Sequence, residues 1–209
     1  MKRIHLILLA ICALLTTTLE LDLGRRAPAA ASDAFVHEAT GSQAGDPELV
    51  ERIAARLAAR RSALSPRDRR TLAETIVREA RAQGLEPHLV AAVIEVESAG
   101  HPLAVSHVGA LGLMQILPET GRELAQKHGV PWSGPNTLFD PAINVKLGAA
   151  YLRELTNRYG DVSIALAAYN WGPGVIDRRL REGTKLPSEY IDSVMRAFVR
   201  ESVGATRAS

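Results

Sequence analysis

Apolar residues recur with helical spacing along most of the chain after residue 45. Leu49, Ile53 and Leu57 lie four residues apart, and Leu72 and Ile76 repeat that spacing farther along. Because one face of an α-helix repeats about every 3.6 residues, this pattern predicts amphipathic helices. No segment alternates apolar and polar residues with strand period over a useful length, and there is no internal repeat. We therefore expect an all-α domain.

Start signals delimit several of these helices. A capping residue followed by proline occurs at Asp46-Pro47, Ser65-Pro66 and Asp140-Pro141, where the proline suits the first helical turn. Asp161 is placed to cap a segment, residues 162–168, that is apolar almost all round. Such a segment is typical of a buried central helix. Two more helices are expected, over residues 87–98 and from about 188 to 200.

The amino-terminal segment has the features of an export signal. Lys2 and Arg3 precede an apolar run over residues 4–15, which suits a signal-peptide core and is too short to cross a bilayer comfortably. Ala29-Ala30-Ala31 offers a cleavage site of small residues. The charged stretch before this site leaves an uncleaved membrane anchor as the alternative. Both interpretations place the body of the protein outside the cytoplasm, in the periplasm or cell envelope.

The same patterns divide the chain into five segments. We expect a signal peptide or anchor over residues 1–31, a flexible tether over 32–45, an accessory helix over 46–64, the main helical domain over 65–200 and a tail over 201–209. The accessory helix has two possible roles, as a brace for the domain or as a docking element for a partner.

Charge and cysteine content exclude several classes of protein. The first 31 residues hold four of the 25 basic and two of the 23 acidic residues, so the rest of the chain is formally neutral. Arg52, Arg56 and Arg60 are interpreted as a solvated helix face, with weak attraction to an anionic polymer or membrane as the alternative. No nucleic-acid partner is expected. The single cysteine excludes a disulfide framework, and the absence of metal-ligand spacing or an EF-hand loop predicts no metal and no organic cofactor.

Glu97 is the strongest candidate for a catalytic acid. Three, four and seven positions before it lie Ile94, Val93 and Val90, so Glu97 shares the inward face of its helix, whereas Glu95 has smaller and more polar neighbours. Burial and the carboxyl end of the helix dipole both raise a carboxyl pKa. A carboxyl protonated near neutral pH can donate a proton to a glycosidic oxygen. The alternative is a structural glutamate, bonded to a loop amide or paired with an arginine.

The residues after Glu97 support a ligand site. The run HPLAVSHVGALG, residues 101–112, places glycines and short polar residues between two helices, which suits a loop whose backbone approaches a ligand. Gln115 lies among apolar residues and must find hydrogen-bond partners, of which a substrate group is one. Tyr169 and Asn170 end the central helix just before a Gly-Pro-Gly turn, where they can face a pocket mouth.

Together these residues resemble the soluble-lytic-transglycosylase (SLT) domain, family 1, whose fold is akin to goose-type lysozyme. The likeness covers roughly residues 69–198 and implies an all-α, lysozyme-like catalytic domain. The matching segments are Glu97-Ser98, AVS at 104–106, GALGLMQILPET at 109–120, DPAINVKLGAAYL at 140–152, ALAAYNWGPG at 165–174 and LPSEY at 186–190.

The resemblance implies cleavage of the β-1,4 bond between N-acetylmuramic acid and N-acetylglucosamine in peptidoglycan. Glu97 would be the sole acid/base, first protonating the glycosidic oxygen and then accepting the proton of the muramoyl 6-hydroxyl as a 1,6-anhydro ring closes. The sequence offers no second carboxylate in a comparable setting, whereas ordinary glycosidases use a pair. Two alternatives stay open: a muramidase that hydrolyses with water, and a wall-binding or assembly protein without turnover.

The resemblance also implies partners and binding residues. Peptidoglycan strands are the expected partner, an envelope-spanning secretion or conjugation complex is a further candidate, and the chain is expected to be a monomer. Substrate-binding residues carried over by the match are Ser98, Ser106, Met114, Gln115, Tyr169, Asn170 and Tyr190. Tyr190 is expected to approach the acid from the last helix, and Ser98 is expected mainly to fix its loop.

Four positions near these motifs need separate interpretations. Trp171 stands where the family carries a small residue, and it either fills a gap in the core or narrows a sugar subsite. Glu119 is expected to be a surface residue at the start of a helix. His101 and His107 flank the expected cleft loop, and neither is expected to act as a metal ligand or acid/base.

Overall fold

The structure, a computed structural model, describes residues 46–59 and 64–206, without the side chains of 201–206. Within this part the chain is helical, apart from loops and two isolated bridges, Val105 with Leu111 and Leu111 with Ile116. The all-α prediction is therefore confirmed. The expected leader and tether, residues 1–45, lie outside the described residues, as does the end of the expected tail after residue 206.

The predicted helices at 46, 65, 87, 140, 161 and 188 are all present. The described elements are α2 (Pro47–Ala59), α3 (Pro66–Ala82), α4 (Pro87–Ser98), α5 (Pro118–Lys127), the 3₁₀ turn η1 (Pro135–Phe139), α6 (Pro141–Tyr159), α7 (Val162–Trp171), α8 (Pro173–Arg181) and α9 (Glu189–Thr206). The last helix extends past the expected end near residue 200, and neither η1 nor α8 was predicted.

Side-chain caps begin four of the helices as their sequences indicate, and the first is Asp46, whose Oδ1 accepts from the Leu49 amide (3.2 Å) at the start of α2. Ser65 Oγ accepts a hydrogen bond from the Asp68 amide (3.1 Å) at the start of α3. Asp140 and Asp161 accept corresponding bonds at the starts of α6 and α7, at 2.9 and 3.0 Å. Each cap satisfies an amide that has no partner within its own helix, and so fixes where the helix begins.

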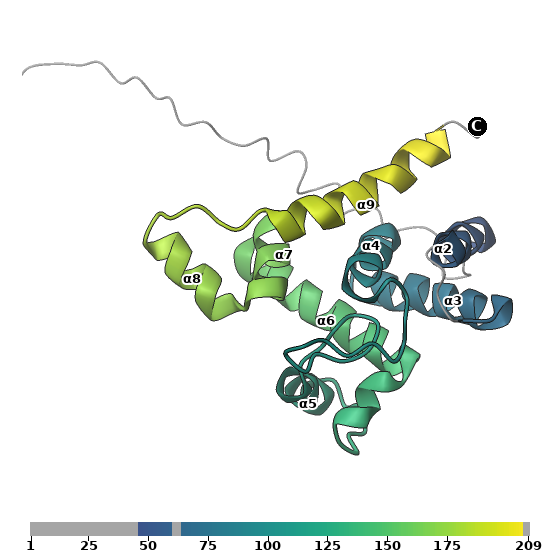
Figure 1. Cartoon of the computed structure of the whole chain (residues 1–209), viewed down its shortest axis with the longest axis horizontal. Helices are drawn as coiled ribbons and strands as arrows, with labels where there is room; N and C mark the ends of the chain where they lie inside the picture. Colours follow the sequence, from purple (N-terminus) through teal and green to yellow (C-terminus); the bar gives the residue numbers. More distant parts are fainter. Residues whose placement is uncertain (1–45, 60–63, 207–209) are drawn as a thin grey trace, which may run out of the picture.

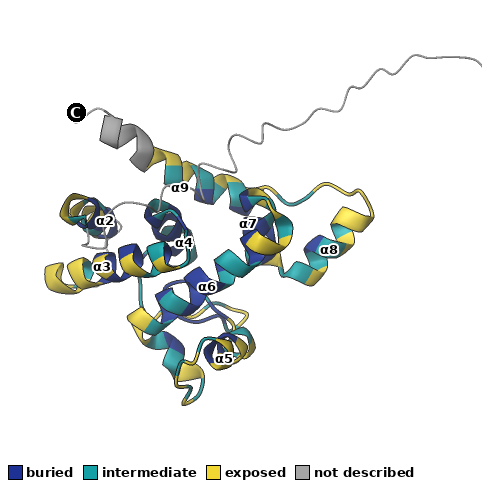
Figure 2. Ribbon diagram, turned by 180° about the vertical axis from the view of Figure 1, so that it is seen from behind, coloured by how far each residue is buried: buried dark blue, intermediate teal, exposed yellow. Residues whose placement is uncertain are grey.

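Helices α4 and α7 form the interior of the molecule (Figure 2), and α9 lies across both of them (Figure 1). Residues 89–94 of α4 and 165–168 of α7 are buried. Helix α2 packs on α3, and its apolar stripe joins the same core as α4. Helix α5 packs against α6. Leu166 of α7 shares the main core with α4 and α9, whereas Ala165, Ala167 and Ala168 pack in a second, smaller cluster with Leu155 and Ile176.

The interpretation of Arg56 as part of a solvated helix face is wrong. Its side chain is 4% exposed and pairs with Glu95, 2.7 Å from Nε to Oε2. Arg52 remains partly exposed and pairs with Glu48 within α2, whereas residue 60 lies outside the described residues. Of the helices in residues 46–59 and 64–206, none combines the length and apolar character needed to cross a membrane.

Candidate active site

Glu97 lies in the last turn of α4, where the carboxyl end of the helix meets the core. The helix stops at Ala99, which takes the left-handed conformation with φ of 52° and is followed by Gly100. Burial raises the pKa of Glu97 from 4.5 to about 7, and a hydrogen bond from the Tyr190 hydroxyl to Oε1 (2.6 Å) acts in the opposite direction. Glu97 is therefore poised to hold or release a proton near neutral pH.

Two buried tyrosines complete the surroundings of this carboxyl. The pKa values of Tyr190 on α9 and Tyr169 on α7 are raised well above 10, first by burial and then by the charge of Glu97. Both phenols therefore stay protonated at neutral pH, where each can donate a hydrogen bond. Tyr169 donates to the carbonyl oxygen of Met114 (2.8 Å), and its ring is tilted against Tyr151 with centroids 5.4 Å apart. Three helices thus converge on one acid.

Backbone strain marks the loop that follows. Ala99 and Gln115 are the two non-glycine residues with positive φ in the described part of the chain, at 52° and 50°. Such conformations are unfavourable for residues with a Cβ and persist where the surrounding structure imposes them. The two lie at the ends of the segment that runs from α4 toward α5, so the strain is concentrated beside Glu97.

The amide of Gln115 is oriented by the loop itself. Its Nε2 donates to the carbonyl oxygens of Gly112 (2.8 Å) and Ala104 (3.2 Å). Both amide protons are therefore used, and no donor among the described residues reaches Oε1. Because the side chain is half-buried, that oxygen is an acceptor available to a ligand hydroxyl or amide.

Asn144 on α6 supports this loop and was not singled out by the sequence. It is fully buried; its Oδ1 accepts from the Met114 amide (2.7 Å), and its Nδ2 donates to the carbonyls of Leu138 (2.8 Å) and Leu111 (3.0 Å). A Cβ on Gly112 would collide with this amide. The available signal was an asparagine inside the apolar stripe of the DPAINVKLGAAYL segment, since such a residue needs buried partners.

The remaining sequence-predicted residues occupy different settings. The Ser98 hydroxyl is buried, donates to Leu113 O (2.8 Å) and Ile94 O (3.1 Å), and accepts from the Gly100 amide. This agrees with the expectation that it fixes the loop. The Met114 side chain is fully buried.

Ser106 and Asn170 lie closer to solvent. The Ser106 hydroxyl is half-buried and accepts from the Ala110 amide (3.0 Å). Asn170 is exposed at the end of α7, one residue after Tyr169. The structure thus groups Glu97, Tyr169 and Tyr190 closely, whereas the side chains of Ser106 and Asn170 form no hydrogen bond with that group.

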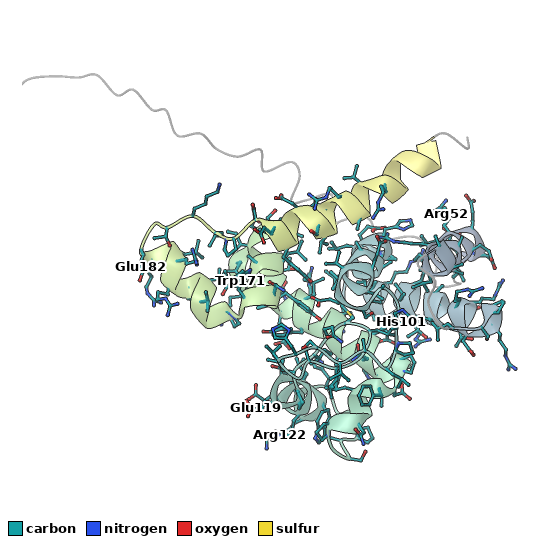
Figure 3. The ribbon with its side chains drawn as sticks, viewed as in Figure 1. Arg52, His101, Glu119, Arg122, Trp171 and Glu182 are labelled. Carbon is teal, nitrogen blue, oxygen red and sulfur yellow. The ribbon has the colours of Figure 1, made fainter. Side chains whose placement is uncertain are left out.

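The exposure of Trp171 and of Glu119 bears on the interpretations made from the sequence. Trp171 is 48% exposed at the end of α7, so it does not fill a gap in the core (Figure 3). A subsite wall remains the alternative for its role. Glu119 is exposed in the first turn of α5, as expected for a surface residue (Figure 3).

The chemistry of the site centres on one carboxyl. Burial and Tyr190 account for the pKa of Glu97, and neither involves a second carboxylate. Within the described residues no three His, Cys, Asp or Glu side chains are grouped so as to hold a metal ion. The arrangement can therefore donate a proton and take it back, with the Tyr190 phenol bonded to the carboxyl and the Tyr169 phenol close enough for the charge of Glu97 to raise its pKa.

Comparisons with known proteins identify the family of this chain. The transglycosylase SLT domain family matches residues 74–191, more than half of the chain. The chain is 44% identical to the transglycosylase of Enterobacteria phage PRD1 over 47% of its own length, and 41% identical to the soluble lytic murein transglycosylase of Escherichia coli K12 over 52%. Those matches cover 34% and 16% of the two relatives, so the chain spans about a third of the relatives' length or less.

A solved structure shares the fold. An inactive glutamate-to-glutamine mutant of the lytic transglycosylase Slt from Pseudomonas aeruginosa superposes with a TM-score of 0.57 at 33% identity, covering 63% of this chain and 24% of that one. The helical architecture, the order of the motifs and the family match agree, and the chain belongs to the transglycosylase SLT domain family.

Proposed function

We propose that this protein is a peptidoglycan lytic transglycosylase, which cleaves the bond between N-acetylmuramic acid and N-acetylglucosamine and leaves 1,6-anhydro ends. The observation that carries the proposal is the half-buried Glu97 carboxyl, whose pKa is raised to about 7 while Tyr190 bonds to Oε1. Membership of the SLT domain family and the names of its relatives, lytic murein transglycosylases among them, support the same activity.

The reaction follows from the two oxygens of Glu97. Since Oε1 accepts from Tyr190, the carboxyl proton resides on Oε2 and is delivered from there to the glycosidic oxygen. As the bond from that oxygen to the muramoyl C1 breaks, positive charge develops on the sugar, and the Glu97 carboxylate is left beside it. The carboxylate then takes the proton of the muramoyl 6-hydroxyl while the oxygen of that hydroxyl bonds to C1. The acid is regenerated, and no water is consumed.

Substrate contacts are proposed for the polar groups around the acid. Gln115 Oε1 can accept from a sugar hydroxyl or an N-acetyl amide, because its own amide protons are bonded to the loop. Asn170 and Trp171 are exposed at the end of α7, where the indole can stack on a sugar ring. Met114 contributes through its backbone, since its side chain is fully buried. Ser106 shapes the loop and presents its hydroxyl near the surface.

Export to the periplasm or cell envelope is proposed along with this activity. The substrate lies outside the cytoplasmic membrane, and the expected leader over residues 1–31 would carry the domain there. Relatives include proteins named membrane-bound lytic murein transglycosylase C, for example that of Cronobacter sakazakii, 37% identical over 115 residues. A cleaved leader and a retained anchor are both compatible with this location. Peptidoglycan strands are the proposed partner, and an envelope-spanning complex remains a candidate for recruitment.

Product analysis tests the proposal. Purified full-length chain is incubated with peptidoglycan sacculi, and the soluble fragments are identified by mass spectrometry beside those of Glu97→Gln. We expect anhydro-muropeptides from the wild type and a loss of turnover of roughly a hundred- to ten-thousand-fold in the variant, because the general acid is removed. Glu119→Gln is the matched control, since Glu119 is an exposed glutamate on α5, and it should retain full activity.

Each other outcome points to a different function. Reducing-end products would show a muramidase that uses water. Binding to sacculi without any product would favour a wall-binding or assembly protein. Full activity in Glu97→Gln would overturn the assignment of the acid.

A further inference from the structure

A buried ion pair ties α2 to the two helices that carry the acid and its tyrosine. Arg56 Nε bonds to Glu95 Oε2 (2.7 Å), and Arg56 Nη2 donates to the carbonyl oxygen of Ala197 (3.0 Å). Glu95 lies on α4 two residues before Glu97, and Ala197 lies on α9 two turns after Tyr190. One guanidinium therefore contacts both elements whose spacing sets the hydrogen bond between Glu97 and Tyr190.

Glu95, the acidic member of this pair, also forms an ion pair with a residue of α9. Arg200 Nη2 bonds to Glu95 Oε1 at 2.6 Å, so the Glu95 carboxylate accepts from α2 and from α9 at once. Arg56, Ala197 and Arg200 all lie outside residues 74–191, the part that matches the SLT domain family. Three of the four residues of this network therefore lie beyond the matched part of the chain, whereas Glu95 lies within it.

Burial makes a purely stabilising role for this pair unconvincing. The Arg56 and Glu95 side chains are 4% and 8% exposed, and Arg56 Nη1 is buried with no hydrogen-bond partner among the residues that the structure describes. Removing two charges from water is costly, and apolar residues of similar size often give equal or greater stability. An ion pair adds geometric specificity, because the planar guanidinium can donate its hydrogen bonds only to partners in one arrangement.

The pair acts on Glu97 through geometry and not through its charges. Burial and the Tyr190 hydrogen bond are the causes of the Glu97 pKa, and neither Arg56 nor Glu95 is among them. The groups that face Glu97 are the phenols of Tyr190 and Tyr169, whereas Glu95 faces Arg56 and Arg200. The two carboxyls thus lie on one helix in separate surroundings.

We propose that Arg56 and Glu95 are positioning residues, which fix α4 against α9 so that Glu97 stays enclosed and in contact with Tyr190. Helix α2 is then a brace of the catalytic unit. The inference deepens the proposed function, and its turnover measurements rest on that function. The contact between α4 and α9 can be tested without that function, because the protonation of Glu97 can be followed in the protein without substrate.

The test compares Arg56→Met with Arg52→Met in the full chain. Arg52 lies one turn earlier on α2, pairs with Glu48 on the surface and is the matched control (Figure 3). The pKa of Glu97 is read by NMR from ¹³C-carboxyl-labelled glutamate, with Glu97→Gln identifying the signal. We expect Arg56→Met to lower that pKa by about one unit, because loosening α4 from α9 admits water to the carboxyl, and burial is a larger cause of the raised pKa than the opposing Tyr190 hydrogen bond that loosening would also weaken. Arg52→Met should leave it unchanged.

Conservative variants keep the test decisive if Arg56→Met folds poorly. Arg56→Lys preserves the charge but not the fork, and Glu95→Gln preserves the shape but not the charge. Each should fold, and each should lower the Glu97 pKa less than Arg56→Met. In the turnover assay we expect Arg56→Met to reduce kcat roughly tenfold with little change in KM, and Arg56→Lys to restore part of it.

The outcomes separate this inference from the proposed function. If folded Arg56→Met, Arg56→Lys and Glu95→Gln all keep the wild-type Glu97 titration, the pair only supports the fold and the inference fails. If no variant, wild type included, releases anhydro products, the proposed function fails while the titration still decides the role of Arg56.

Discussion

Glu95 and Glu97 lie two residues apart on α4, and their neighbours give them different chemistry. Glu95 is enclosed by arginines from α2 and α9, which compensate its charge. Glu97 is enclosed by two phenols and apolar side chains, which offer no compensating charge and raise its pKa to about 7. A proton is therefore retained at the second carboxyl near neutral pH, where general-acid chemistry needs it.

The pH dependence of kcat/KM follows from this protonation. The acid form of Glu97 starts the reaction, so kcat/KM should fall with rising pH through a midpoint of about 7. Tyr190→Phe removes a hydrogen bond that lowers the Glu97 pKa, so this midpoint should move to higher pH. The rate below the midpoint should drop roughly tenfold, because the carboxyl loses its orientation.

Turbidity clearance of sacculi, measured from pH 5 to 9, supplies these profiles. Tyr159→Phe is the control, since the Tyr159 hydroxyl bonds to Asp177 and to Pro173 O, away from the acid. A Tyr190→Phe profile that moved to lower pH would contradict the assigned hydrogen bond.

The same pKa shift makes stability depend on pH. The carboxyl has a pKa near 4.5 in the unfolded chain and about 7 in the fold, so the folded state binds the proton more tightly. Its contribution is fully present below pH 4.5, is lost as the pH rises toward 7 and stays lost above it. Glu97→Gln cannot ionise and escapes this loss. Its free energy of unfolding should exceed that of the wild type at pH 8 by at most about 3 kcal/mol.

Urea denaturation of both proteins at pH 4.5 and pH 8 measures this difference. The gain of Glu97→Gln should be larger at pH 8 than at pH 4.5. An equal difference at the two pH values would show that Glu97 has the same pKa in the folded and unfolded chain.

The sequence predicted Glu97 and missed Glu95 for a physical reason. The apolar residues three, four and seven positions before Glu97 lie on the same helix, so a helical pattern displays that part of its surroundings, although the two phenols come from distant parts of the chain. The partners of Glu95 are 39 and 105 residues away, and no local pattern connects them. The smaller residues beside Glu95 suggested a solvated position, whereas arginines from two other helices fill that space.

At the level of elements, α6 presents Asn144 as the support of the strained loop beside the acid. Asn144→Leu keeps the size of the side chain but leaves the Met114 amide and the carbonyls of Leu111 and Leu138 without this partner. Buried polar groups without partners are costly, so we expect a loss of about 3 kcal/mol or more in the free energy of unfolding. Turnover should fall as well, since Asn144 holds the amide of Met114, and Gln115 is the next residue in the chain.

Asn157→Leu is the matched control for this substitution. Asn157 lies on the same helix and is exposed, so its replacement should change the stability by no more than about 0.5 kcal/mol. Thermal denaturation and sacculus turnover of both variants give the comparison. Equal stability of the two variants would show that the loop does not depend on Asn144.

Elements with strong local signals were predictable, and those fixed by distant contacts were not. Caps followed by proline located the starts of α2, α3 and α6, and an apolar segment behind Asp161 located α7. Helix α8 has nine residues, only Ile176 buried and four charged side chains, so its sequence resembles a solvated loop. The loop between α4 and α5 takes its shape from Asn144 on α6, which sequence spacing alone does not reveal.

At the level of the whole molecule, α2 belongs to the same hydrophobic core as the matched domain. Leu49, Val50, Ile53 and Leu57 are buried against it, and every buried apolar residue that the structure describes lies at or after Leu49. The segment expected as an accessory helix is thus integrated by packing as well as by Arg56. A boundary at residue 65 separates two helical sequence patterns, but the buried apolar residues of α2 pack in the same core as those of α3 and α4.

Two truncations test that continuity. A chain of residues 46–209 keeps the described core and should match the full chain in stability. A chain of residues 65–209 loses four buried apolar side chains and exposes the faces of α3 and α4 that they cover, which should cost on the order of 5 kcal/mol or more. That is comparable with the total stability of many domains, so the shorter chain should be partly unfolded at 37 °C. Circular dichroism during urea and thermal denaturation measures both. Equal midpoints for the two truncations would mean that α2 is an appendage, and the brace inferred from Arg56 would then have to act without contributing to the core.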